Sequence, residues 1–219
     1  MEKKKIIELV TAYVKEKQSG EGSGHDWWHT YRVLKTAQYL AEKEEADDFI
    51  VSLGALLHDI ADWKFAEGDT EASSKVTRKL LGEYGVDPET IEAICHINDH
   101  ISYKGANEKN KIETIEGKVV QDADRLDALG AIGIARTFAY GGSAGREIYN
   151  PEIDPKENMT FVQYKKNTKS PSLNHFYEKL LLLKDKLNTT SAKKIAKERH
   201  QFLLTFLDQF YKEWEAKYE

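Results

Sequence analysis

Cysteine is nearly absent from the sequence, since Cys95 is the only one among 219 residues. No disulfide can therefore form within the chain, and a reducing compartment is compatible with it. Basic residues are not in excess either: 32 Lys and Arg stand against 37 Asp and Glu, a formal net charge of -5. Proteins that bind a nucleic-acid polymer usually carry a basic surface, so the composition argues against such a partner. A small anion stays compatible, because a few local Lys or Arg side chains suffice for it.

Long apolar runs are missing as well. None approaches the roughly 20 residues that a membrane-spanning helix needs, and the polar first five residues are unlike a secretory signal. We therefore expect a cytoplasmic protein without a membrane partner. Internal repeats, low-complexity tracts and strong strand-like alternation are absent too. With 40% hydrophobic and 32% charged residues, the chain has an ordinary folded composition. Its length fits one large domain, or at most a domain with a helical appendage.

Helical periodicity dominates from end to end, which predicts an all-α fold. The segment 50–57 is apolar nearly all round, so its helix should lie buried at the centre. A short run at 112–120 has some strand character but is assigned to a helix. Irregular structure is expected at 102–110 and at 141–161, which contain glycine or proline. The expected helices cover residues 6–20, 26–45, 50–57 and 117–140. Two more are marked by their ends: one is capped by Asp69 or Thr70 and stopped by Gly85, and the next begins at Asp87-Pro88-Glu89. The C-terminal helix is amphipathic, and its apolar face includes Ile195, Phe202, Leu203, Phe206, Leu207, Phe210 and Trp214.

Two ionisable residues, His58 and Asp59, follow the central apolar run directly. A buried polar group without a partner costs about 1–3 kcal/mol, so both side chains need partners there. Neighbouring residues on a helix project about 100° apart, which lets the pair bind one ion from two sides. A His-Asp pair by itself is more often structural than functional, because short motifs frequently occur by chance.

Other segments add the side chains that a metal site would need. His25 and His29 lie one turn apart at the start of a predicted helix. Asp122, Asp124 and Asp127 place three carboxylates within two turns of an otherwise apolar helix. Two neutral imidazoles and two carboxylates balance the charge of a divalent cation. Spacing alone does not choose between the three aspartates.

In this order, His29, the pair His58-Asp59 and Asp124 resemble the signature of the HD-domain superfamily of metal-dependent phosphohydrolases, which is a His, a His-Asp pair and a distant Asp. In that family the metal-binding Asp is followed by a basic residue, an apolar residue and another Asp, which selects Asp124. The similarity covers most of the chain and points to a small bacterial subfamily of about this length. It is carried by the blocks 24–33, 56–63, 96–105 and 120–136.

The resemblance implies a single HD-type helical domain over residues 1–219. Its metal-binding core would lie at about 24–136, with C-terminal helices at about 172–216 packed on it. It also implies one divalent ion held by the four signature residues. Two imidazole ligands favour a transition metal such as Mn²⁺, Co²⁺, Ni²⁺, Fe²⁺ or Zn²⁺, although Mg²⁺ is still allowed.

A proton acceptor is expected close to this ion. Asp62 comes three residues after Asp59, so it faces the same side of the helix or lies just beyond its end. Related phosphohydrolases often carry an acidic residue at this place that acts on the attacking water, which makes Asp62 the predicted catalytic base. The alternative is a solvated carboxylate, paired for example with Arg32.

Basic side chains are expected to bind the substrate phosphate. Arg125 follows Asp124, and a basic residue here contacts phosphate in related enzymes, offsetting the charge of a polyphosphate. His96 and His100 lie one turn apart. They could donate hydrogen bonds to phosphate, or bind a second metal ion as histidines do in some relatives; alternatively, one of them is a histidine of the hydrophobic core. We favour phosphate contacts, because the extended motifs of the cyclic-dinucleotide-cleaving branch are missing. Lys179 is a weaker phosphate contact, as are Lys104 and His175.

The pattern as a whole predicts a metal-dependent phosphohydrolase that acts on a small nucleotide or phosphate ester. The expected substrate is a (deoxy)nucleoside triphosphate or monophosphate. One alternative is a phosphodiesterase for a cyclic or signalling nucleotide. Another is a regulatory nucleotide-binding module without turnover, whose mark would be a missing ligand residue, and none is missing. A serine or cysteine nucleophile is not expected, because no nucleophile elbow is present and Cys95 has no basic partner beyond the histidines already assigned. Both a monomer and a homodimer are compatible with the sequence.

Overall fold

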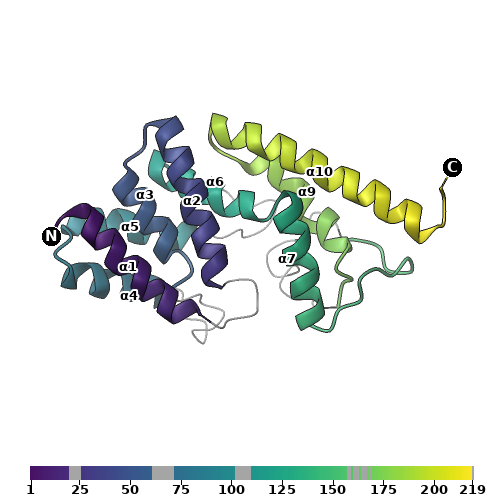
Figure 1. Ribbon diagram of the computed structural model, residues 1–219, viewed down its shortest axis with the longest axis horizontal. Helices are drawn as coiled ribbons and strands as arrows, with labels where there is room; N and C mark the ends of the chain where they lie inside the picture. The colour runs from purple at the N-terminus through teal and green to yellow at the C-terminus, as the bar shows by residue number, and fades with distance from the viewer. Residues whose placement is uncertain are drawn as a thin grey trace. The chain divides into compact units, whose positions relative to one another are not determined.

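The computed structural model describes residues 1–19, 26–60, 72–101, 110–156, 159, 163, 167 and 169–218. Every regular element among these residues is a helix, which confirms the predicted all-α fold (Figure 1). The described residues up to Asp124 form one compact unit, and those from Arg125 onward form a second. None of the described helices is long and apolar enough to cross a membrane.

The first unit is built around α3, as the sequence predicts. Every α3 residue from Val51 to Leu57 is buried, and α1, α2 and α5 pack against this helix. Gly54 admits a close approach, since a Cβ there would lie 3.4 Å from Val120 of α6 and 3.6 Å from Ile97 of α5. The helices of this unit are α1 (Lys3–Gln18), α2 (Trp27–Glu44), α3 (Asp48–Leu57), α4 (Ala72–Glu83), α5 (Pro88–His100) and α6 (Ile115–Asp127), whose last three residues belong to the second unit.

Capping side chains fix where these helices begin. Asp26 accepts a hydrogen bond from the backbone N–H of His29 at 3.0 Å and so starts α2. Asp87 caps α5 in the same way, and Pro88 follows it at the first helical position, as expected. Gly85, in the left-handed region with φ 72°, follows the end of α4. The expected cap of α4 at Asp69 or Thr70 lies outside the described residues.

The prediction of one continuous helix over residues 117–140 is wrong. α6 ends at Asp127 and α7 (Gly130–Ser143) begins after a short break. Gly130 has a φ of 72°, a conformation that favours glycine and ends helices. The carbonyl of Leu126 accepts from Arg199 Nη1 at 2.6 Å and from the backbone N–H of Leu129 at 3.0 Å, so the end of α6 is held by a turn and by a distant side chain. Apolar residues continue at helical spacing on both sides of the break, so the sequence pattern predicted a single helix.

The second unit is dominated by the C-terminal helix α10 (Thr190–Trp214), which packs against α7 and confirms the helix expected there. Leu203 and Leu207 are buried, whereas Phe202 and Trp214 of the same predicted apolar face are about half exposed. The remaining elements form one winding stretch: η1 (Phe176–Leu180, π-helical), α9 (Leu181–Leu183) and η2 (Lys184–Lys186, 3₁₀). The described part of 141–161 is irregular beyond the end of α7, as expected.

Candidate metal centre

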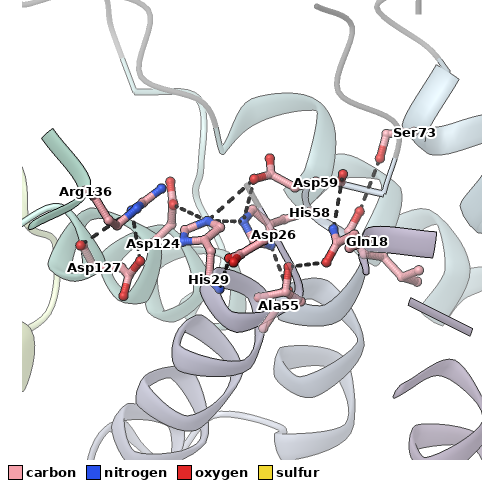
Figure 2. A network of polar contacts seen from close by, with 12 residues as sticks. Gln18, Asp26, His29, Ala55, His58, Asp59, Ser73, Asp124, Asp127 and Arg136 are labelled. Carbon is pink, nitrogen blue, oxygen red and sulfur yellow. Dashed lines mark hydrogen bonds and ion pairs between the residues drawn. The ribbon is translucent and has the colours of Figure 1, made fainter. Parts of the chain in front are cut away.

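Four of the predicted site residues lie together within the first unit (Figure 2). His29 Nε2 and His58 Nε2 lie 3.2 Å apart, and both side chains are almost fully buried. Asp59 Oδ2 lies 3.5 Å from His29 Nε2 and 3.4 Å from His58 Nε2. Asp124 Oδ1 lies 3.5 Å from His29 Nε2. Residues from α2, from the turn after α3 and from α6 thus meet at one place.

Two helix ends present the histidines. His29 is in the first turn of α2, where the cap by Asp26 fixes the backbone. α3 ends at Leu57, so His58 and Asp59 lie in the turn that follows. His58 Nδ1 donates to the carbonyl of Ala55 at 2.7 Å. Because a carbonyl can only accept, the neutral ring keeps its lone pair on Nε2, the atom that faces His29.

Acidic neighbours dominate the electrostatics of His58. Burial alone lowers the pKa of its imidazole, but the Asp59 carboxylate, through its charge and a hydrogen bond, raises it. The charge of Asp124 and the hydrogen bond to Ala55 add to this, and the pKa becomes about 9. A buried ring that holds a proton so firmly lies where the surrounding groups favour positive charge. The same groups would favour a cation.

The donor set fits a divalent ion. Donor atoms held about 2.1 Å from one cation, in tetrahedral or octahedral geometry, lie about 3.0 to 3.4 Å from each other. The three distances among the tips of His29, His58 and Asp59 are 3.2 to 3.5 Å. His29, His58 and Asp59 each offer a ligand atom within 4.8 Å of the others, so this group could hold a metal ion. Asp124 stands outside that group and joins it through its contact with His29.

The structure separates the three aspartates of α6. Asp124 is the one whose carboxylate approaches His29, at 3.5 Å. Asp127 lies in the second unit and accepts from Arg136 Nη1 at 2.8 Å, while Asp122 is fully buried. The choice of Asp124 that the family pattern made is thus compatible with the geometry. Its role as a ligand stays a prediction.

The predicted phosphate contacts occupy separate places. The rings of His96 and His100 lie next to each other along α5, with centroids 4.4 Å apart and planes tilted by 35°, and His100 Nδ1 donates to the His96 carbonyl at 2.9 Å. Arg125 Nη1 donates to the carbonyl of Lys186 within the second unit. Lys179 lies half-buried in η1. These four stay predictions as substrate contacts, and Asp62, the predicted base, lies outside the described residues.

Four side chains that support the site were not predicted from the sequence: Asp26, Gln18, Thr30 and Ser73. Gln18 and Thr30 are buried polar residues that contact each other next to the site. Ser73 Oγ donates to the carbonyl of Leu57 at 3.3 Å. Asp26 could have been recognised as a helix cap, because it directly precedes a helical pattern. No sequence signal marks the other three, since their partners lie on different helices.

Comparison with known proteins finds a matching family and relatives that are similar over nearly the whole chain. The HD domain family matches residues 27–129. YpgQ from Bacillus subtilis is 39% identical over 214 residues, which cover 97% of this chain and 96% of YpgQ. A crystal structure of YpgQ in complex with ADP has a TM-score of 0.74 at 37% identity, covering 94% of this chain and 97% of that one.

Two further solved structures extend over nearly the whole length. A protein from Lactobacillus plantarum has a TM-score of 0.86 at 37% identity, covering 99% of this chain and 100% of that one. An HD-superfamily hydrolase from Bacillus thuringiensis has a TM-score of 0.77 at 45% identity, with the same coverage.

Proposed function

Since this chain belongs to the HD-domain family of hydrolases, we propose that it is a metal-dependent phosphohydrolase acting on a nucleotide. The observation that carries the proposal is the convergence of His29, His58 and Asp59 on a common point, with Asp124 in contact with His29. Buried imidazoles beside carboxylates are a donor set for a divalent transition metal, with Mn²⁺, Co²⁺, Ni²⁺, Fe²⁺ and Zn²⁺ as the candidates and Mg²⁺ still allowed.

A nucleotide substrate is supported by the relative that binds one. YpgQ was crystallised with ADP, and it is similar to this chain over nearly its full length. A (deoxy)nucleoside triphosphate or monophosphate is the substrate we propose. Such a ligand brings several negative charges, so cationic or donor side chains are needed around its phosphates. His96, His100, Arg125 and Lys179 are the side chains we propose for this.

The reaction adds water across a phosphate ester or anhydride bond. The water oxygen bonds to phosphorus while the bond to the leaving oxygen breaks, and we propose that Asp62 accepts the released proton. A bound divalent cation supplies a Lewis acid, which polarises a phosphoryl oxygen and makes water more acidic. The Ala55 carbonyl holds His58 in one tautomer, and the Asp26 cap holds the first turn of α2, so both rings are oriented before substrate arrives.

The test is a screen of the purified chain, first stripped with a chelator and then loaded separately with each of the candidate metals. Nucleoside mono-, di- and triphosphates and cyclic nucleotides are offered, and phosphate, pyrophosphate and tripolyphosphate are measured. We expect hydrolysis of a nucleoside tri- or monophosphate with at least one transition metal. Asp59→Ala should lose both bound metal and activity.

The products also discriminate between the remaining functions. Cleavage of cyclic nucleotides alone would replace the proposal by a phosphodiesterase. Tight nucleotide binding without turnover under every metal would indicate a regulatory module instead. A fully active Asp59→Ala variant that contains no metal would refute the proposed chemistry.

A further inference from the structure

The turn that carries His58 and Asp59 is held by side chains because it follows a helix end. The last carbonyls of a helix have no helical N–H donors, and buried ones need other partners. The His58 ring donates to Ala55 O at 2.7 Å. Leu57 O accepts from Ser73 Oγ at 3.3 Å and from the backbone N–H of Ile60 at 3.2 Å. The carbonyl of Asp59 itself accepts from Gln18 Nε2, over a long 3.4 Å.

Gln18 links this turn to the helix that carries His29. It is the last residue of α1 and is buried, with 7% of its surface exposed. Its Oε1 accepts a 2.8 Å hydrogen bond from the hydroxyl of Thr30, which is fully buried and directly follows His29 in α2. One amide group therefore bonds at once to Thr30, the residue beside His29, and to the backbone of Asp59. Figure 2 shows Gln18 close to the turn that carries His58 and Asp59.

We propose that Gln18 is a positioning residue of the candidate metal centre, which sets the separation between His29 and Asp59 by bonding to Thr30 and to the Asp59 carbonyl. The inference deepens the proposed function and rests on it. Gln18 does not touch the ion. It acts through two backbone segments that each carry a ligand, in the way that outer partners orient the ligands of other metal centres.

The amide is the group that this place requires. Gln18 must accept from a hydroxyl and donate to a carbonyl at the same time, and an amide offers both functions at one end of a side chain. A glutamate offers acceptors alone and would face the Asp59 carbonyl with negative charge. A methionine has the length but neither function, so both the Thr30 hydroxyl and the Asp59 carbonyl would lose a partner.

The chain provides a matched control for this change. Gln38 of α2 is also a partly buried glutamine that bridges two helices, because its Nε2 donates to Ser52 Oγ of α3 at 3.1 Å. This bond does not involve the candidate ligands. Q38M therefore removes an equivalent interhelical hydrogen bond without touching the link between Thr30 and Asp59.

The experiment measures Mn²⁺ affinity by titration calorimetry on chelator-stripped protein, together with the thermal unfolding midpoint of each metal-free variant. We expect Q18M to bind Mn²⁺ about 10-fold more weakly than wild type, at the low end of the effect of removing outer partners. Q38M should bind Mn²⁺ with an affinity within about 2-fold of wild type, even if its unfolding midpoint falls by as much as that of Q18M. Thr30→Val should weaken binding similarly, and the double variant should be little worse than either single one, because both changes break the same link.

Several outcomes would overturn the proposal. Wild-type Mn²⁺ affinity in a folded Q18M refutes the positioning role while leaving the metal centre intact. Equal losses in Q18M and Q38M reduce Gln18 to a general stabilising residue and refute it too. If Q18M does not fold, Thr30→Val tests the same hydrogen-bonded link between Thr30 and Asp59. Wild-type Mn²⁺ affinity in Thr30→Val would then refute the positioning role of Gln18. A wild-type chain that binds none of the candidate metals refutes the proposed function, and the inference with it.

Discussion

Two aspartates of α6, three residues apart, should respond in opposite ways to the same isosteric change. Asp124→Asn removes a carboxylate whose oxygen lies 3.5 Å from His29 Nε2 and whose side chain is 30% exposed. Asp127→Asn removes one that is 5% exposed and accepts from Arg136 at 2.8 Å. The first change should abolish tight metal binding with little effect on the metal-free fold. The second should destabilise the fold and spare the metal.

The magnitudes follow from burial. Removing one partner of a buried ion pair costs about 3–5 kcal/mol, and the partly exposed Arg136 places Asp127→Asn near about 3 kcal/mol. For a chain of this size each kcal/mol lowers the unfolding midpoint by about 2–4 °C, so the expected shift is about 6–12 °C. Asp124 is more exposed, and its loss should change the metal-free stability by less than about 1 kcal/mol. Metal affinity should fall by more than about 100-fold, because even partners that only orient ligands contribute about 10–100-fold.

Both quantities can be measured on the same preparations. Elemental analysis and Mn²⁺ titration report the metal, and thermal unfolding after chelation reports the fold. The reasoning fails if Asp127→Asn loses the metal while Asp124→Asn retains it. It also fails if both variants bind Mn²⁺ as tightly as wild type, since Asp124 would then not be a ligand.

Two further predictions concern a helix cap and a half-buried histidine, His175. Asp26→Ala should lower the free energy of unfolding by about 1 kcal/mol and also weaken Mn²⁺ binding, because the lost cap holds the turn with His29; Asp87→Ala, which uncaps α5 in the same way, should leave Mn²⁺ binding unchanged, and a parallel loss there would contradict the local effect. Burial, with the charges of Lys179 and Arg146, lowers the pKa of His175 to about 3. Between pH 6.5 and 3 the unfolded chain therefore binds a proton that the folded chain excludes, and stability falls as the pH drops through this range. The free energy of unfolding, measured with urea, should fall between pH 7 and pH 5 by about 2 kcal/mol less in His175→Gln than in wild type. Equal falls in the two proteins would show that His175 titrates normally.

Much of the helical order was predictable because it depends on local signals. The central helix was recognised from an apolar run, and it is buried over Val51 to Leu57. The start of α5 followed from Asp87 and Pro88, a cap and a first-turn proline. Such signals act over a single turn, so they are visible without knowledge of the tertiary structure.

The break between α6 and α7 was missed for the opposite reason. Hydrophobic residues continue at helical spacing on both sides of Gly130, and an isolated glycine is tolerated in a helix. What stabilises the break is tertiary: Arg199, far along the chain, donates to the Leu126 carbonyl and packs its side chain against Gly130. Sequence periodicity carries no information about such a partner.

The candidate site shows the same division. The resemblance to the HD signature predicted that His29, His58, Asp59 and Asp124 lie close together, whereas residue chemistry and spacing alone left three aspartates of α6 as candidates. How they are held could not be predicted, because the supporting bonds come from other elements. Gln18 belongs to α1 and Ser73 to α4, and neither residue type nor spacing sets them apart from other polar residues in amphipathic helices.

The position of the site at helix ends explains why its supporting bonds come from other elements. His29 lies in a first turn and His58 just after a last turn, the places where a helix leaves backbone groups without partners. Those unmet groups must be satisfied when buried. Here their partners are the side chains of Asp26, His58, Ser73 and Gln18, together with the backbone N–H of Ile60. The bonds that complete the helix ends are therefore the same bonds that orient the candidate ligands. A site built in mid-helix would lack this coupling, because its backbone groups would already be paired within the helix.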